Sequence, residues 1–232
     1  MANQDLQLRR SARTAGRWYF VMAIVGAFCL LYVPSKIMVA GDAEATVSNI
    51  LANETLFRVG ILADLISQFL FIITVLYLYR LFKEVNLQYA RLMVALVLAP
   101  ALMAFPFELI NVAVLVLLSG PGYLSAFTTS QLHAMAMFFL DISQQSTFIW
   151  EIFWGLWLIP FGLLVFKSKF IPKILGVLLL INGFSYITDS FIFLLLPVYH
   201  DVIRKFLMAP MIIGEFSIIL WLLIVGARRK TE

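Results

Sequence analysis

One stretch of sequence decides the fold, His133–Phe166, which reads HAMAMFFLDISQQSTFIWEIFWGLWLIPFGLLVF. Its apolar residues continue beyond the roughly 20 positions that an α-helix needs to cross a bilayer. Two carboxylates, Asp141 and Glu151, interrupt it. The stretch therefore predicts a long membrane-spanning helix that carries acidic groups inside the membrane.

Five further runs have the apolar character and length of spanning helices. They are Trp18–Val39, Phe57–Phe82, Tyr89–Leu118, Pro172–Leu196 and Phe206–Ala227. The chain is 62% hydrophobic and only 13% charged, a composition that a soluble domain of 232 residues cannot bury. We therefore expect an all-α, polytopic transmembrane bundle of six spanning helices in one domain, residues 18–227.

Shorter segments flank and connect these runs. Residues 1–17 are expected to form a basic cytoplasmic arm, and residues 228–232 a basic cytoplasmic tail. In the first external loop, Asp42 can cap a short helix in which Val47 and Ile50 share a face. We expect this amphipathic helix to lie on the external surface of the membrane.

The distribution of Lys and Arg predicts the orientation. Six crossings place four of the 17 basic residues on one side and the other 13 on the opposite side, and the four are Lys36, Arg58, Arg204 and Lys205. The positive-inside rule then puts both termini in the cytoplasm. His200 falls in an external loop on this interpretation. Because the basic residues lie at the ends of apolar runs, the net charge of +4 indicates lipid rather than nucleic acid as the partner.

Six carboxylates lie inside the apolar runs: Asp64, Glu108, Asp141, Glu151, Asp189 and Glu215. An ionised Asp at the bilayer centre costs about 2.5–3.5 kcal/mol, so six in contact with lipid would cost roughly 15–20 kcal/mol. These groups must instead face each other, water or a ligand. Counting residues from the helix ends predicts five of them at a similar level in the outer half of the membrane, with Glu151 deeper.

Other polar side chains recur at helical spacing beside these carboxylates, so a bundle would turn them inward together. We expect an outward-facing acidic cavity, and its predicted ligand-binding residues are Arg58, Asp64, Glu108, Asn111, His133, Asp141, Gln144, Glu151, Asn182, Asp189 and Glu215. Two simpler interpretations stay open. Single polar residues often join membrane helices through hydrogen bonds, and Asp64 could simply pair with Arg58.

A set of short stretches along the chain carries a family resemblance: Ala12-Arg-Thr-Ala-Gly16, Gly41-Asp-Ala43, Ile50-Leu-Ala52, Leu56-Phe-Arg58, Pro172-Lys-Ile-Leu-Gly176, Tyr186-Ile-Thr-Asp-Ser190, Gly214-Glu215 and Leu220-Trp221. Together they resemble a bacterial membrane family, domain of unknown function 4386, over nearly the whole chain. The resemblance implies an inner-membrane protein of six to seven helices and brings no established activity. It makes Arg58, His133, Asp189 and Glu215 the first positions to test.

Three functions are compatible with these features, and no residue is identified as catalytic. The first is binding or transport of a small polar or cationic solute, coupled to protons by the carboxylates, with a homodimer supplying a second half. The alternative is an intramembrane metal-dependent hydrolase for a lipid-like substrate, in which His133 and Asp141 help to hold Zn²⁺. The third is a structural or signalling bundle without a small ligand. The single cysteine, Cys29, excludes a disulfide within the chain.

Overall fold

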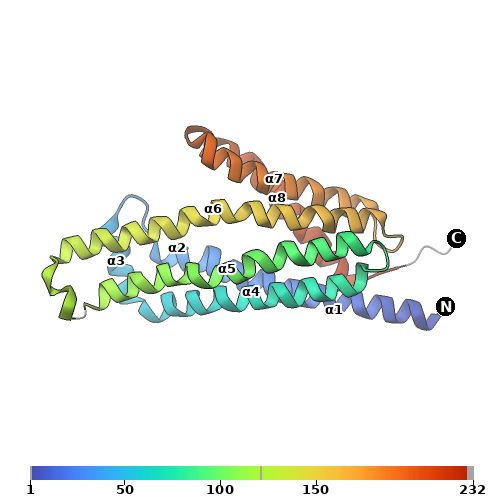
Figure 1. The fold of residues 1–232 in the computed structure, drawn as a ribbon, viewed down its shortest axis with the longest axis horizontal. Coiled ribbons are helices and arrows are strands. Elements are labelled where there is room, and N and C mark those ends of the chain that lie inside the picture. The colour runs from blue at the N-terminus through green and yellow to red at the C-terminus, as the bar shows by residue number, and fades with distance from the viewer. Residues whose placement is uncertain (1, 121, 229–232) are drawn as a thin grey trace. The chain divides into compact units, whose positions relative to one another are not determined.

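A computed structural model describes residues 2–120 and 122–228, with side chains from residue 5 onward. These residues form helices and contain no strand (Figure 1). Six helices are long and apolar enough to cross a membrane, so the predicted all-α bundle is confirmed and the protein is a multi-pass membrane protein. Of the predicted tail, Arg228 is described, and residues 229–232 lie outside the described residues.

The helices follow one another with short connections. The first span consists of α1 (Ala2–Ala27), a π-helical turn η1 (Phe28–Tyr32) and α2 (Val33–Ile37). The remaining elements are α3 (Ala43–Ala52), α4 (Glu54–Phe82), α5 (Leu87–Ser119), the 3₁₀ turn η2 (Gly122–Ala126), α6 (Thr129–Lys167), α7 (Lys173–Leu195) and α8 (Pro197–Ile224).

Two compact units share these helices. The first unit contains Met1–Met22, Leu70–Ala101 and Phe148–Glu232, and the second contains Ala23–Phe69 and Leu102–Thr147. Each unit therefore takes segments from α1, α4, α5 and α6, while α7 and α8 belong to the first unit alone.

In the first unit, a seam of glycines lets α6 and α7 approach closely. A Cβ atom on Gly183 would lie 2.8 Å from the backbone oxygen of Gly155, and one on Gly176 would lie 2.7 Å from the oxygen of Gly162. The two pairs recur every seven residues along antiparallel helices, so the contact persists over two turns. Because the obstacle at each pair is backbone, the seam fixes the position of α7 along α6.

Aromatic rings fill the interior of the first unit beside this seam. The ring of Trp157 stacks on Phe161 at 5.3 Å, and both rings contact Tyr19 from α1. Tyr19 and Phe161 are fully buried. The N-terminal part of α1 is held by side chains as well: Arg9 donates a hydrogen bond to the oxygen of Val225, at the C-terminal end of α8. Basic groups at a helix C-terminus satisfy carbonyls that lack partners within the helix.

The second unit has its own apolar core, to which the predicted amphipathic helix contributes. Asp42 accepts a hydrogen bond of 2.9 Å from the backbone N–H of Ala45, so it caps α3 as expected. On this helix, Val47 and Ile50 are fully buried. They belong to an apolar cluster that also contains Val33 and Phe57. The short helix predicted after Asp42 is therefore confirmed.

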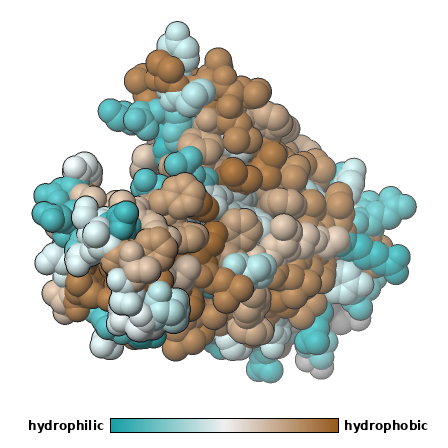
Figure 2. Space-filling model, turned by 60° about the vertical axis from the view of Figure 1, so that its left-hand side comes forward, coloured by the Kyte–Doolittle hydropathy of each residue, from teal (hydrophilic) through white to brown (hydrophobic). Residues whose placement is uncertain are grey.

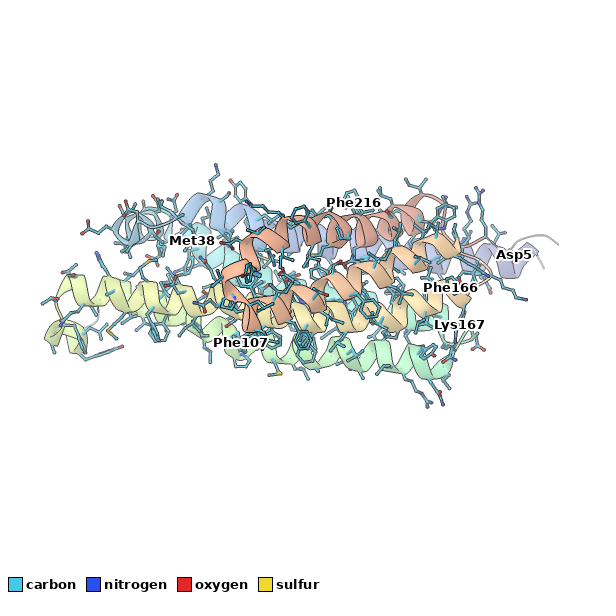
Figure 3. The ribbon with its side chains drawn as sticks, turned by 90° about the horizontal axis from the view of Figure 1, so that it is seen from above. Asp5, Met38, Phe107, Phe166, Lys167 and Phe216 are labelled. Atoms are coloured by element: carbon cyan, nitrogen blue, oxygen red, sulfur yellow. The ribbon has the colours of Figure 1, made fainter. Side chains whose placement is uncertain are left out.

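The surface has the character of a protein embedded in lipid. Figure 2 shows apolar side chains over much of the visible face. At the ends of two helices, cations lie over aromatic rings: the Lys167 ammonium is 4.5 Å from the centre of the Tyr89 ring, and that of Lys173 is 5.3 Å from the Phe166 ring. Phe166 and Lys167 mark this end of α6 in Figure 3. Such pairs suit a boundary between hydrocarbon and water.

The structure corrects the predicted start of the sixth span. Helix α8 begins at Pro197 rather than Phe206, and only Leu196 separates it from α7. Proline is favoured in the first turn of a helix because its missing N–H has no partner to lose there. His200, which was expected in an external loop, is therefore a buried helical residue, and Arg204 lies in the same helix. Without Arg204, the external side keeps three basic residues and the opposite side keeps 13, so the predicted orientation does not change.

Candidate functional site

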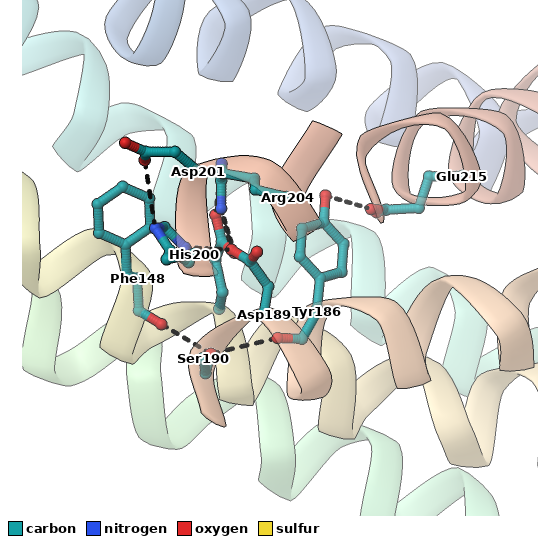
Figure 4. A network of polar contacts seen from close by, with 9 residues as sticks. Phe148, Tyr186, Asp189, Ser190, His200, Asp201, Arg204 and Glu215 are labelled. Carbon is teal, nitrogen blue, oxygen red and sulfur yellow. Dashed lines mark hydrogen bonds and ion pairs between the residues drawn. The ribbon is translucent and has the colours of Figure 1, made fainter. Parts of the chain in front are cut away.

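Arg204 on α8 joins carboxylates from two other helices of the first unit. Its Nη2 donates to Oε1 of Glu151 at 2.9 Å, and its Nη1 donates to Oε2 of the same group at 3.1 Å. Nη1 also donates to Oδ2 of Asp189 on α7 (Figure 4). A planar guanidinium suits this forked geometry better than an ammonium would. We call Arg204, Glu151 and Asp189 the Arg204 centre.

Helix lengths explain why the two carboxylates meet at one level. Glu151 lies 16 residues before the end of α6 (167 − 151), and Asp189 lies 16 residues after the start of α7 (189 − 173). The prediction that Glu151 lies deeper than Asp189 is therefore wrong. That prediction measured depth from the start of α6 and from the end of α7. Because α6 has 39 residues and α7 has 23, these two ends do not lie at the same level.

The centre is buried, and its charges do not balance when both carboxyl groups are ionised. Asp189 is 0% exposed and Glu151 is 2% exposed, whereas the Arg204 side chain retains 26%. The Phe148 ring covers Arg204, with its centre 4.8 Å from the guanidinium carbon. Oδ1 of Asp189 is buried and has no hydrogen-bond partner among the described residues. Two carboxylates thus share one permanent cation, and one acceptor oxygen remains unused.

His200 lies beside the centre, one helical turn before Arg204. Its Nε2 is 3.4 Å from Oδ2 of Asp189, and its Nδ1 is 3.7 Å from Oδ1 of Asp201. The imidazole meets the rings of Phe148 and Phe193 edge to face, at centre distances of 4.8 and 5.3 Å. These two rings hold the plane of the imidazole so that its nitrogens point at the two carboxylates.

A second polar group in the first unit surrounds Glu215 on α8. The Tyr19 hydroxyl donates to Oε1 of Glu215 at 2.5 Å, and the Tyr186 hydroxyl donates to Oε2 at 3.4 Å. Asn182 donates from Nδ2 to the backbone oxygen of Met211 at 2.8 Å, and its Oδ1 is buried without a partner among the described residues. Among the described residues, the recorded partners of the Glu215 carboxyl group are thus the two phenols and the Asn182 amide, not a guanidinium.

The second unit contains a carboxyl pair, and no cation among the described residues is recorded in contact with it. Asp64 on α4 and Glu108 on α5 lie within hydrogen-bonding reach of each other. Asn111 donates to Glu108 at 3.0 Å, and the Cys29 thiol lies 3.7 Å from Oδ1 of Asp64. Cys29 belongs to the π-helical turn η1, a distortion that often accompanies functional positions in helices.

Other predicted site residues of the second unit lie elsewhere. Arg58 pairs with Glu54 at 2.7 Å and is exposed, so the predicted alternative in which Arg58 pairs with Asp64 is wrong. Asp141 and Gln144 are exposed on α6. His133 lines a surface groove together with residues of α3 and its cap, which include Asp42, Glu44 and Val47.

The structure thus divides the predicted site between the units. Glu151, Asn182, Asp189 and Glu215 belong to the first unit, and Arg58, Asp64, Glu108, Asn111, His133, Asp141 and Gln144 to the second. A single cavity that holds them all stays a prediction. Among the described residues, no group of three or more His, Cys, Asp or Glu side chains is arranged to hold a metal ion, so the zinc site at His133 and Asp141 gains no support from geometry.

Sequence reasoning missed Arg204, His200 and Tyr19. The first two lie in a polar stretch with Asp201 and Lys205, between the predicted fifth and sixth spans. Pro197 was the signal that could have found them, since it permits a helix to begin there and places His200 and Arg204 on one face, four residues apart. For Tyr19, no signal in the sequence points to Glu215.

Of three comparisons with known proteins, one finds a match. The family model of the domain of unknown function DUF4386 matches residues 14–226, which is most of the chain. Neither the search of curated proteins nor the search of solved structures returns a match.

Proposed function

For this chain, which belongs to the DUF4386 family, we propose that the Arg204 centre binds a small cationic or polar solute inside the membrane and serves its transport. The observation that supports this most is the charge balance. Glu151 and Asp189 carry two negative charges when ionised, and Arg204 supplies one positive charge. A buried negative charge without a counterion is costly, so the centre favours an additional cation or a proton.

The location of the centre supports the same function. Ionisable residues in membrane helices commonly mark the pathway of a solute or a proton. Glu151, Asp189 and Arg204 come from three different spanning helices, so a small relative movement of any helix would change the site. The unused Oδ1 of Asp189 is an acceptor for a hydrogen-bond donor such as an ammonium, a guanidinium or water.

The proposal includes the cellular setting. The resemblance to a bacterial inner-membrane family favours an inner membrane, and the basic residues at the helix ends favour both termini in the cytoplasm. Arg9, Lys167 and Lys173 then lie on the cytoplasmic side, and the short turn at Leu196 faces outward. The Arg204 centre is about 24 Å from the start of α7, given 1.5 Å per residue over 16 residues, and so lies in the outer half of the bilayer.

A binding experiment tests the proposal. Purified protein in detergent is titrated with methylammonium, tetramethylammonium, guanidinium and ethanolammonium while its thermal unfolding is followed. At least one of these probes should raise the Tm of the wild type, because a ligand that binds only the folded state stabilises it.

Matched variants locate that effect. The Tm increase should be lost in Glu151→Gln and in Asp189→Asn, each of which removes the surplus negative charge. It should persist in Glu54→Gln, which neutralises an exposed carboxylate on α4. Equal Tm increases in all three variants, or none in the wild type with any probe, would count against solute binding at this centre.

A further inference from the structure

A line of three ionisable side chains runs from the surface of the first unit to its most buried carboxylate. The Asp201 side chain is 98% exposed, that of His200 is 7% exposed, and that of Asp189 is 0% exposed. The imidazole lies between the two carboxylates and presents one nitrogen to each (Figure 4). Along this line, a single histidine separates Asp189 from the exposed Asp201 carboxylate.

The groups around His200 suit proton transfer. Asp189 from α7 faces Nε2, and Asp201 from α8 faces Nδ1. The remaining charges nearby are those of Arg204, one turn further along α8, and Glu151 on α6, which Arg204 binds. Imidazole can accept a proton on one nitrogen and release a proton from the other, which no other side chain does near neutral pH.

We infer that Asp201, His200 and Asp189 form the route by which protons reach the Arg204 centre. In the forward step, Nδ1 of His200 accepts a proton from the Asp201 carboxyl group, which water then reprotonates, and the ring becomes an imidazolium. Nε2 then releases its proton to Oδ2 of Asp189, which leaves a neutral imidazole and a neutral carboxylic acid. Exchange between the two tautomers resets the ring, so the net change is one proton moved inward and no oxidation.

The arrival of this proton has a consequence for the solute of the proposed function, on which this part of the inference rests. Once Asp189 is protonated, Arg204 and Glu151 form a balanced pair with two hydrogen bonds. The surplus negative charge that attracts a cation has then gone. A proton and a cationic solute therefore exclude each other at the centre, which is the requirement for exchanging one for the other across a membrane.

Time-resolved infrared spectroscopy after a rapid drop in pH tests the route without any solute. The signal is the carbonyl band of a protonated carboxylic acid, and the part that belongs to the centre is identified by its absence in Asp189→Asn. His200→Gln should slow the appearance of this band by at least about tenfold, since glutamine cannot relay a proton. His133→Gln removes the other histidine of the chain and should leave the rate unchanged.

Two further measurements separate a relay from a structural role. Asp201→Asn replaces an exposed side chain, so it tests the route without disturbing packing. This variant should also lower the rate at which the carbonyl band appears. Free imidazole should restore the rate in His200→Ala. Wild-type rates in both His200→Gln and Asp201→Asn would overturn the inference. The infrared measurement uses no solute, so its outcome does not depend on the binding experiment. If the protein binds none of the cationic probes, the proposed function is refuted, but the proton route is still tested.

Discussion

The two units hold acidic groups in different ways. In the first unit, Glu151 and Asp189 share a guanidinium and are almost completely buried. In the second unit, Asp64 and Glu108 contact each other, and their other polar contacts include an amide and a thiol. A hydrogen bond between two carboxyl groups requires a proton on one of them. A membrane bundle can thus hold two carboxyl groups together either with a built-in cation or with a shared proton. The first arrangement depends on a fixed side chain, whereas the second depends on a proton that can leave.

The largest expected effect comes from removing the cation of the first unit. Arg204→Leu leaves two buried carboxylates without a counterion, and it should lower the free energy of unfolding by about 3–5 kcal/mol. Unfolding by SDS in mixed micelles measures this. Arg58→Leu removes a guanidinium from an exposed pair in the second unit and should cost about 0–1 kcal/mol. Similar losses in the two variants would show that the Arg204 centre is not a buried ion pair.

The next effect compares the packing of the two units. Gly183→Ala in the first unit drives a methyl group against the backbone of Gly155, so it should cost about 1–3 kcal/mol and separate Asp189 from Glu151. Gly60→Ala in the second unit meets only the Val33 side chain, at 3.0 Å, and should cost less than about 1 kcal/mol. Thermal unfolding in detergent compares them. A larger loss in Gly60→Ala would contradict the importance of the glycine seam.

A smaller effect concerns the hydrogen bonds of Glu215. Tyr19→Phe removes a bond of 2.5 Å from a fully buried residue and should destabilise the protein by about 1.5 kcal/mol. Tyr186→Phe removes a bond of 3.4 Å and should cost about 0.5 kcal/mol. Equilibrium unfolding of both variants under one condition gives the ranking, and the reverse order would show that Tyr186 is the principal partner.

The smallest effect is expected in the carboxyl pair of the second unit. Glu108→Gln replaces a group that can share a proton with one that donates through its amide, so the contact with Asp64 is retained. The free energy of unfolding should change by less than about 1 kcal/mol. A loss as large as that of Arg204→Leu would mean that the charge of Glu108 is required, and the distinction between the units would then fail.

The sequence predicted the membrane fold well because the information is local. Apolar runs of sufficient length specify spanning helices, and Asp42 followed by Val47 and Ile50 specifies a capped amphipathic helix without reference to the rest of the chain. The predicted start of α8 was wrong for an equally local reason. The polar residues after Pro197 resemble a loop unless their partners in the bundle are known.

The candidate site was harder to predict because it depends on how helices align. The sequence shows that Glu151 and Asp189 are acidic and within apolar runs, but their meeting depends on the offset between α6 and α7. The glycine seam sets that offset through backbone contacts. Arg204 then selects these two carboxylates from the six, and that choice follows from the rotation of α8 rather than from any spacing along the chain.

The turn of one residue between α7 and α8 has a consequence for biosynthesis. Leu196 alone connects them, so the two helices can enter the lipid together as a hairpin that already carries Asp189 and Arg204 in opposite arms. Either side chain alone would oppose insertion by roughly 2.5–3.5 kcal/mol at the bilayer centre, whereas a paired acid and base enter with their charges offset. The hairpin can thus bring its own counterion into the membrane before the acidic partner on α6 joins it.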